Sequence, residues 1–207
     1  MTFITICQDL ISSDDCTQLI NQFNLDDRKK KGETVDGNLD AQHDKISTDL
    51  QCNFLDTSYQ SYNELILPPV KTLVEQIKDQ YTFLHYCGYW QITGDYNIQH
   101  YTDQQGYFSP HCEQGAAYPH RMMAWTLYLN DSPCGTEFPY QEMIVHATQG
   151  QGAIWAASWT HPHKGVTPNI GDKYIVTGWC EFFNPDIPPR LSTPWISHPV
   201  DNSVENF

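Results

Sequence analysis

The feature that most constrains the fold is a series of short segments after Tyr89 that are rich in Trp, Tyr, Ile, Val and Thr. Gly, Pro, Asn and Asp separate them, which is typical of β-strands joined by tight connections. The predicted strands are 89–101, 107–112, 121–129, 142–147, 152–156, 161–165 and 173–182. Short strands at this spacing predict an antiparallel sandwich or barrel with helices packed outside it.

The N-terminal part predicts those helices. Residues 3–6 predict a short strand, and residues 12–15 (Ser-Ser-Asp-Asp) offer N-cap side chains to a helix that follows. The apolar residues of that helix are Cys16, Leu19, Ile20 and Phe23. A second helical pattern runs over residues 56–77, and Pro68 and Pro69 are expected to kink it or divide it in two.

The chain length of 207 residues fits a single domain with a substantial core. Residues 26–49 are polar and contain two glycines, so they are expected to form an exposed excursion from that domain. A cover over an active site and an ordinary surface loop both fit this segment.

The formal net charge of -14, from 25 acidic and 11 basic residues, disfavours binding to nucleic acid or to an anionic membrane. A cationic partner or simple solubility would each account for it. The seven cysteines are an odd number without C-x-x-C spacing, and the N-terminus lacks a basic signal region. No apolar stretch reaches the roughly 18 residues of a membrane helix. We therefore expect a soluble cytoplasmic protein with free thiols.

The motif His111-Cys112-Glu113 carries the first indication of chemistry. On a strand, residues two positions apart project from the same face, so the imidazole and the carboxylate could bind one metal ion. A third ligand could come from His161 or His163. Two histidines and one carboxylate are the ligand set of non-haem Fe(II) oxygenases. Taken alone, this spacing also fits a solvated surface pair.

Several further motifs follow in order over residues 89–183, and together they resemble the prolyl-4-hydroxylase-like branch of the 2-oxoglutarate/Fe(II)-dependent dioxygenase superfamily. The motifs are 99–101 (Gln-His-Tyr), 111–113 (His-Cys-Glu), 121–131 (an Arg-led strand containing Tyr128-Leu129), 135–139 (Gly-Thr-Glu-Phe-Pro), 150–155 (Gly-Gln-Gly-Ala-Ile-Trp) and 173–179 (Lys-Tyr-Ile-Val-Thr-Gly-Trp). The resemblance implies a mostly β fold with flanking helices, in which residues 89–183 form a double-stranded β-helix (jelly-roll) catalytic core. Residues 1–88 would support that core, and residues 184–207 would form a C-terminal tail.

The resemblance also implies a set of site residues. The metal ligands would be His111, Glu113 and His163, because the family's basic residue lies about ten positions after the second histidine, as Lys173 does after His163. Lys173 would bind the distal carboxylate of 2-oxoglutarate, with Tyr101 and Thr177 as hydrogen-bond partners. Further candidates for the pocket are Arg121, Tyr128, Trp179 and His161.

The activity implied by the resemblance is the hydroxylation of an unactivated C–H bond, coupled to decarboxylation of 2-oxoglutarate to succinate. It would require Fe(II), O2 and 2-oxoglutarate as co-substrate, with ascorbate as reductant. Similarity to prolyl hydroxylases favours a prolyl residue in a peptide or protein, while other side chains and small molecules stay open. The pattern says nothing about the oligomeric state.

Some positions depart from the family pattern. Glu113 replaces the commoner aspartate, Phe108 stands where many relatives have tyrosine, and the N-terminal third resembles the family only loosely, for example at residues 45–49. Two other interpretations remain: a zinc hydrolase that uses the same three ligands, and a non-catalytic cupin-like metal-binding module. The zinc interpretation leaves Lys173 without a role.

Overall fold

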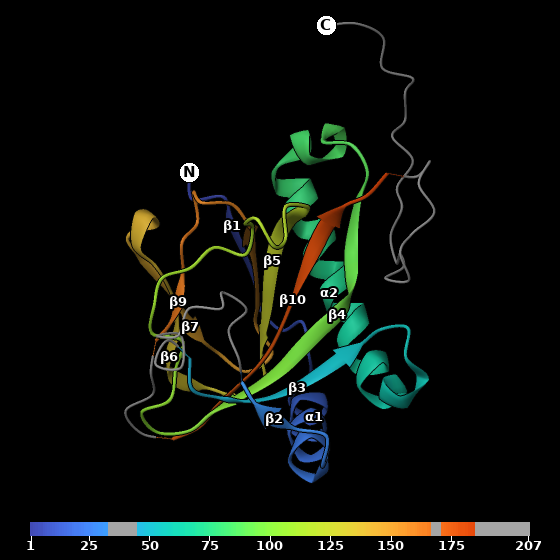
Figure 1. Cartoon of the computed structure of the whole chain (residues 1–207), viewed down its shortest axis with the longest axis vertical. Helices are drawn as coiled ribbons and strands as arrows, with labels where there is room; N and C mark the ends of the chain where they lie inside the picture. Colours follow the sequence, from blue (N-terminus) through green and yellow to red (C-terminus); the bar gives the residue numbers. More distant parts are fainter. Residues whose placement is uncertain (33–44, 167–170, 185–207) are drawn as a thin grey trace, which may run out of the picture.

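The computed structural model describes residues 1–32, 45–166 and 171–184 (Figure 1). The strands are β1 (Ile4–Cys7), β2 (Lys30–Lys31), β3 (Thr48–Asn53), β4 (Trp90–Tyr101), β5 (Arg121–Tyr128), β6 (Ser132–Phe138), β7 (Met143–Ala147), β8 (Gly152–Ala156), β9 (Lys164–Gly165) and β10 (Lys173–Phe182). The helices are α1 (Ser13–Leu25) and α2 (Gln60–Gln80), with short 3-10 turns at Thr57–Tyr59, Thr82–Tyr86 and Pro139–Gln141. The segments 33–44 and 185–207, which include half of the expected excursion and most of the expected tail, lie outside the described residues.

The strands form two sheets. The larger has the order β1-β8-β5-β10-β4-β3-β2, and the smaller has the order β7-β6-β9. Every pair is antiparallel, and β10 lies between β4 and β5, with Lys173 opposite Tyr101 and Thr177 opposite Thr126. This arrangement confirms the predicted double-stranded β-helix core with helices outside it (Figure 1).

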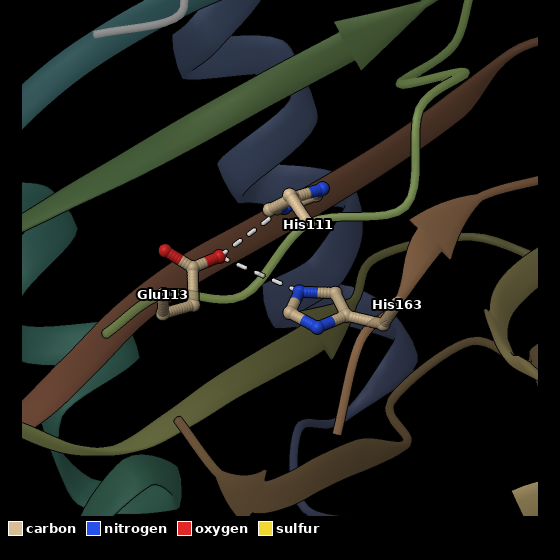
Figure 2. Close-up of side chains that lie close together, drawn as sticks. All are labelled: His111, Glu113 and His163. Carbon is tan, nitrogen blue, oxygen red and sulfur yellow. Dashed lines mark ion pairs between the residues drawn. The ribbon is translucent and has the colours of Figure 1, made fainter. Parts of the chain in front are cut away.

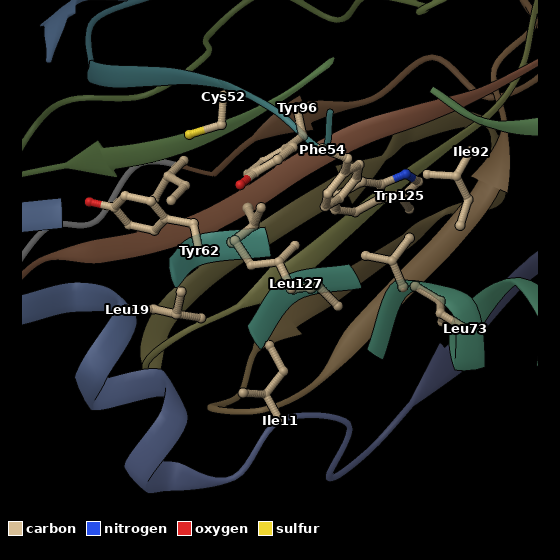
Figure 3. Packing of buried hydrophobic residues seen from close by; sticks show 14 of the residues in the cluster. Ile11, Leu19, Cys52, Phe54, Tyr62, Leu73, Ile92, Tyr96, Trp125 and Leu127 are labelled. Carbon is tan, nitrogen blue, oxygen red and sulfur yellow. The ribbon is translucent and has the colours of Figure 1, made fainter. Parts of the chain in front are cut away.

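Both helices cover one face of the larger sheet. The Ser12 hydroxyl accepts the Asp15 backbone N–H at 3.1 Å, so the predicted N-cap of α1 is confirmed. Cys16, Leu19 and Phe23 of α1 are buried with the apolar stripe of α2 against the strands. Figure 3 shows side chains from α1, α2 and the sheet meeting in this layer, among them Leu19, Leu73 and Trp125. The layer is the main apolar core of the protein.

The second helix is not divided at its prolines. Pro68 and Pro69 lie inside the continuous helix α2, so the expectation that they split it in two is wrong. A proline removes one backbone hydrogen bond and crowds the preceding turn. Burial of Ile66, Val70 and Leu73 on both sides of the pair stabilises the helix against that loss.

The smaller sheet faces the opposite side of the larger one. A second apolar cluster joins Phe138 and Val145 of the smaller sheet to Tyr128, Trp155 and Ile175 of the larger sheet. The Phe138 and Trp155 rings meet edge to face at 5.1 Å between centroids. Residues of both sheets also line the cavity described below.

Most of the strands predicted after Tyr89 are confirmed, but two predictions need correction. Residues 107–112 form no regular strand, because only isolated bridges join Tyr107 to Lys45 and His111 to His163. The strand expected at 161–165 is reduced to Lys164–Gly165. Strands β3 and β6 were not predicted, since Asp and Asn at the ends of β3 and Pro, Cys and Gly within β6 obscure their alternation.

All seven cysteines are free thiols, as expected. Within the described ranges, neither helix is both long and apolar enough to cross a membrane. The cytoplasmic location stays a prediction.

Candidate metal and co-substrate site

The three proposed metal ligands come from two segments that pair over a single bridge. The His111 N–H donates to the His163 carbonyl at 3.0 Å, and the His163 N–H donates to the His111 carbonyl at 2.9 Å. The Glu113 N–H donates to the Ala157 carbonyl at 3.1 Å, which fixes the backbone of the third residue. The ligand segment is therefore held by a few backbone hydrogen bonds and not by a full strand.

The side chains of His111, Glu113 and His163 converge on one point (Figure 2). Glu113 Oε1 lies 3.4 Å from His111 Nε2 and 3.4 Å from His163 Nε2. Ligands at right angles around a metal ion, with bonds of about 2.1 Å, lie about 3 Å apart. The three atoms are thus close to the spacing that one ion requires.

The hydrogen bonds of the Nδ1 atoms indicate the tautomers of His111 and His163. His111 Nδ1 lies 3.2 Å from the Ser109 carbonyl, and His163 Nδ1 lies 3.0 Å from the His161 carbonyl. A carbonyl oxygen can only accept, so both Nδ1 atoms carry the proton and both Nε2 atoms present lone pairs toward Glu113 Oε1. Three converging acceptors repel one another unless a cation lies between them. The donor set therefore fits a bound divalent metal ion.

Ionisation of the site agrees with this fit. Burial raises the pKa of Glu113, but His111 and His163, which in their protonated forms can each donate an Nε2–H to Oε1, outweigh it and hold this pKa well below its usual range. Burial also lowers the pKa of His163 below its usual value. An ionised carboxylate and a neutral imidazole are the forms that bind metal.

The second oxygen of Glu113 has other partners. Trp179 Nε1 donates to Oε2 at 2.7 Å, and the Arg121 guanidinium lies 3.1 Å from the same oxygen. The sequence indicated Arg121 and Trp179 only as candidates for the pocket. Both line the cavity, and both contact a proposed metal ligand.

Lys173 lies deeper in the same cavity and is only 2 % exposed. Its Nζ donates to the Val166 carbonyl at 3.1 Å and the Gly135 carbonyl at 3.4 Å. Among the described residues no carboxylate forms an ion pair with it, and burial lowers its pKa to about 8. A buried cation that lacks an anion is unfavourable, so the site fits a ligand carboxylate at this end.

The residues proposed to assist Lys173 are placed differently. The Lys173 ammonium lies 4.7 Å from the centre of the Tyr101 ring, and the Tyr101 hydroxyl donates to Gln99 Oε1 at 2.8 Å. Tyr101 therefore offers its ring to the cation, while its hydroxyl is engaged elsewhere. Thr177 lines the cavity on the same face of β10, four residues from Lys173.

Thr136 is a cavity residue that the sequence reasoning missed. It follows Gly135, whose carbonyl accepts from Lys173, and its hydroxyl lies 2.8 Å from the Tyr128 hydroxyl. Tyr128 itself belongs to the apolar cluster and is absent from the residues that line the cavity, and its place in the pocket stays a prediction. Only the position of Thr136 next to the Gly135 turn could have indicated its role.

His161 points away from the three ligands. Its Nε2 lies 2.9 Å from the Thr2 carbonyl, and its Nδ1 lies 2.9 Å from the Thr160 hydroxyl. Both ring nitrogens are engaged outside the cavity, and His161 is not among the lining residues. His163 is therefore the histidine that the fold brings to His111 and Glu113.

The cavity has a volume of about 1280 Å³ and is lined by both sheets. It contains the three ligands and Lys173, and it extends across β3 and β4 to Arg28, Lys30 and Lys31. A cavity of this extent can hold a small dicarboxylate and a larger substrate together.

Fold and site together define a double-stranded β-helix protein with a two-histidine-one-carboxylate triad. Residues 96–181 match the family model of the 2OG-Fe(II) oxygenase superfamily. None of the curated proteins matches the chain. The matched segment contains all three ligands and Lys173, so this part of the chain is similar to the 2OG-Fe(II) oxygenase superfamily.

Solved structures of prolyl hydroxylases share the fold at low sequence identity. A viral collagen prolyl hydroxylase from Paramecium Bursaria Chlorella virus-1, in complex with 2-oxoglutarate, is 16% identical with a TM-score of 0.58, over 86% of this chain and 95% of that one. A Pseudomonas putida prolyl-4-hydroxylase is 12% identical with a TM-score of 0.63, over 89% and 95%. A Trichoplax adhaerens prolyl hydroxylase, in complex with a hypoxia inducible factor peptide fragment, is 12% identical with a TM-score of 0.64, over 87% and 84%.

Proposed function

We propose that this protein is an Fe(II)- and 2-oxoglutarate-dependent dioxygenase that hydroxylates a prolyl residue in a peptide or protein. The observation that supports it most is that one cavity contains three converging candidate metal ligands and a buried cation, Lys173, which forms no ion pair within the described residues. A zinc hydrolase would use the same three ligands but gives that cation no role.

Each residue has a defined part in this proposal. His111, Glu113 and His163 would hold the iron, as a two-histidine-one-carboxylate ligand set does in non-haem Fe(II) oxygenases. Bound iron would supply activation of O2, coupled to decarboxylation of 2-oxoglutarate to succinate. Lys173 pairs with the distal carboxylate of 2-oxoglutarate and so fixes the direction in which the co-substrate enters. The Thr136 and Thr177 hydroxyls line the same cavity and are candidates to donate to it.

The substrate assignment rests on the likeness to prolyl hydroxylases and on the open end of the cavity. The Trichoplax adhaerens enzyme was solved with a peptide. Here the cavity continues from the triad to the exposed residues Lys30 and Lys31, and this provides length for an extended chain. A small molecule or a different side chain is the alternative. The use of ascorbate as reductant is part of the proposal.

The test is succinate production by the purified protein with Fe(II), 2-oxoglutarate, ascorbate and O2, repeated with a panel of proline-containing peptides. Turnover that rises with one peptide, together with a mass increase of that peptide by one oxygen atom, is the expected result. Succinate without a peptide response would retain the oxygenase and replace the substrate class. Absence of succinate and of metal-dependent 2-oxoglutarate binding would contradict the proposal.

The choice of histidine has its own matched test. His163→Ala should weaken Mn(II) binding by more than the roughly 10- to 100-fold that loss of an outer partner produces. His161→Ala should leave Mn(II) affinity within a few-fold of the wild type, because its ring nitrogens are engaged by Thr160 and Thr2 and not by the metal site. Titration calorimetry on folded variants distinguishes them, and the opposite order would show that His161 is the ligand.

A further inference from the structure

We infer that Arg121 and Trp179 are positioning residues that hold the second oxygen of Glu113, so that this glutamate binds the metal through one oxygen only. The inference rests on the metal site proposed above. It concerns a position where the chain departs from the aspartate that is commoner in the family. A glutamate has one more rotatable bond than an aspartate, so an unrestrained carboxylate here could turn and present both oxygens to a metal.

The two oxygens of Glu113 have separate environments. Oε1 faces His111 Nε2 and His163 Nε2 at 3.4 Å each. Oε2 accepts the Trp179 indole N–H at 2.7 Å and pairs with Arg121 at 3.1 Å. Hydrogen bonds in which the donor or the acceptor is ionised, as in both of these contacts to the Glu113 carboxylate, are among the stronger ones in proteins. Rotation of Oε2 toward the metal would break both.

Arg121 is itself held in place. Its guanidinium carbon lies 3.7 Å from the centre of the Tyr118 ring on one side and 3.7 Å from the centre of the Trp179 ring on the other. Its Nε lies 3.7 Å from Glu181. A planar cation stacked between two aromatic rings loses little further freedom when it pairs with a carboxylate.

The pairing of β10 with its two neighbouring strands is irregular around Trp179. The β10–β4 register shifts between Gly178 and Cys180, and the β10–β5 register shifts between Cys180 and Glu181. Bulges of this kind redirect side chains near sites. The Trp179 carbonyl also accepts from the Thr93 hydroxyl at 3.1 Å and from Trp125 Nε1 at 3.4 Å, so its backbone is restrained on both sides.

Glu113, Arg121 and Trp179 therefore act as one set. A one-oxygen carboxylate leaves three adjacent positions of an octahedral ion for other ligands. An aspartate at position 113 would be shorter by about 1.5 Å. It could reach the metal or the two donors, but not both. Glu113→Asp should therefore be a damaging change here, although aspartate is the commoner ligand in relatives.

The first test uses Trp179→Phe, which removes the N–H and keeps a ring against Arg121. We expect Mn(II) affinity to fall roughly 10- to 100-fold, as for loss of other outer partners. In the infrared spectrum of the Mn(II) protein, the separation between the two carboxylate stretches of Glu113 should narrow, as it does when both oxygens bind. The matched control is Trp90→Phe, which removes an indole N–H bond to the Leu84 carbonyl outside the cavity and should change neither quantity.

The second test measures coupling. Glu113→Asp should weaken Mn(II) binding strongly in the wild type and much less in the Trp179→Phe background. In that background the hydrogen bond from position 179 to the carboxylate is already absent, so the shorter side chain cannot break it. Additive effects, or a Trp179→Phe variant with the affinity and infrared spectrum of the Trp90→Phe control, would overturn the positioning role while leaving the proposed function intact. A wild-type protein that binds neither Mn(II) nor 2-oxoglutarate would overturn the proposed function, and this inference with it.

Discussion

The two faces of the larger sheet differ in what their side chains do, although they alternate along the same strands. On β10, Tyr174, Val176 and Cys180 belong to the apolar core under the helices, whereas Lys173 and Thr177 face the cavity. The face of the larger sheet that α1 and α2 cover contains apolar side chains, whose removal from water stabilises the fold. The cavity face contains threonine hydroxyls and a buried cation that forms no ion pair among the described residues. Stability therefore depends mainly on one face and binding on the other.

Lys173→Met tests the cavity face most severely. Loss of one member of a buried charge pair costs about 2–5 kcal/mol, so 2-oxoglutarate affinity should fall on the order of 30-fold or more. Metal affinity should stay near the wild type, because Lys173 contacts none of the three ligands. Titration calorimetry with Mn(II) present measures both.

Lys78→Met is the matched control for this change. Lys78 is also a buried lysine, but it lies on α2 and pairs with Glu75 away from the cavity. Its replacement should leave 2-oxoglutarate affinity unchanged. Equal losses in both variants would show that buried lysines here act through the fold alone, and the distinction between the faces would not hold.

Leu127→Ala tests the helix face. Leu127 is fully buried in the core under α1 and α2, and truncation of such a leucine costs about 2–5 kcal/mol of unfolding free energy. Mn(II) and 2-oxoglutarate affinities of the folded variant should change little. Urea unfolding gives the first quantity and calorimetry the second; a folded variant that lost 2-oxoglutarate binding would contradict the separation.

The pH dependence of the free energy of unfolding further tests the difference between the two faces of the larger sheet. Burial lowers the pKa of Lys173 to about 8, against an ordinary value of 10.5, so the folded protein binds fewer protons than the unfolded chain between these values. Its contribution to the free energy of unfolding therefore rises with pH from about 8 to 10.5, by up to roughly 3 kcal/mol. The difference between wild type and Lys173→Met in urea unfolding should change across this window. If the difference in unfolding free energy between the two proteins stayed constant with pH, burial would not lower the pKa of Lys173.

Thr126→Val should have the smallest effect. Thr126 is adjacent to Leu127 but faces the cavity, and in the described part of the chain its buried hydroxyl has no hydrogen-bond partner. Removal of an unsatisfied hydroxyl should leave the free energy of unfolding unchanged or raise it by up to about 1 kcal/mol. A loss as large as that of Leu127→Ala would show that both faces support stability equally.

The sequence predicts the regions where one pattern dominates. Residues 173–182, which are rich in Tyr, Ile, Val, Thr and Trp, predict β10, and the family spacing from Lys173 indicates His163 in preference to His161. The segment 107–120 has no such pattern. His111 is positioned by two backbone hydrogen bonds with His163 and Glu113 by one to Ala157, and both partners are distant in sequence. Contacts between residues distant in sequence produce no local sequence pattern, and the prediction of a regular strand at residues 107–112 is wrong.

The side-chain environment of the ligands was the least predictable part. Thr136 reaches the cavity because Gly135 lies beside Lys173, and Trp179 reaches Glu113 because the register shifts in both neighbouring ladders. Both facts depend on how strands pair and not on residue type. The N-cap at Ser12, by contrast, is a local preference and is confirmed.

Strand β2 also matters for how copies of this protein meet one another. It is the outermost strand of the larger sheet on its β3 side, and it consists of only Lys30 and Lys31, both exposed (Figure 1). An open sheet edge is a template on which a second chain can add a strand and start aggregation, and short lysine-bearing edges oppose this. The same two lysines that lie at the mouth of the cavity thus also protect the sheet against edge-to-edge association at high concentration.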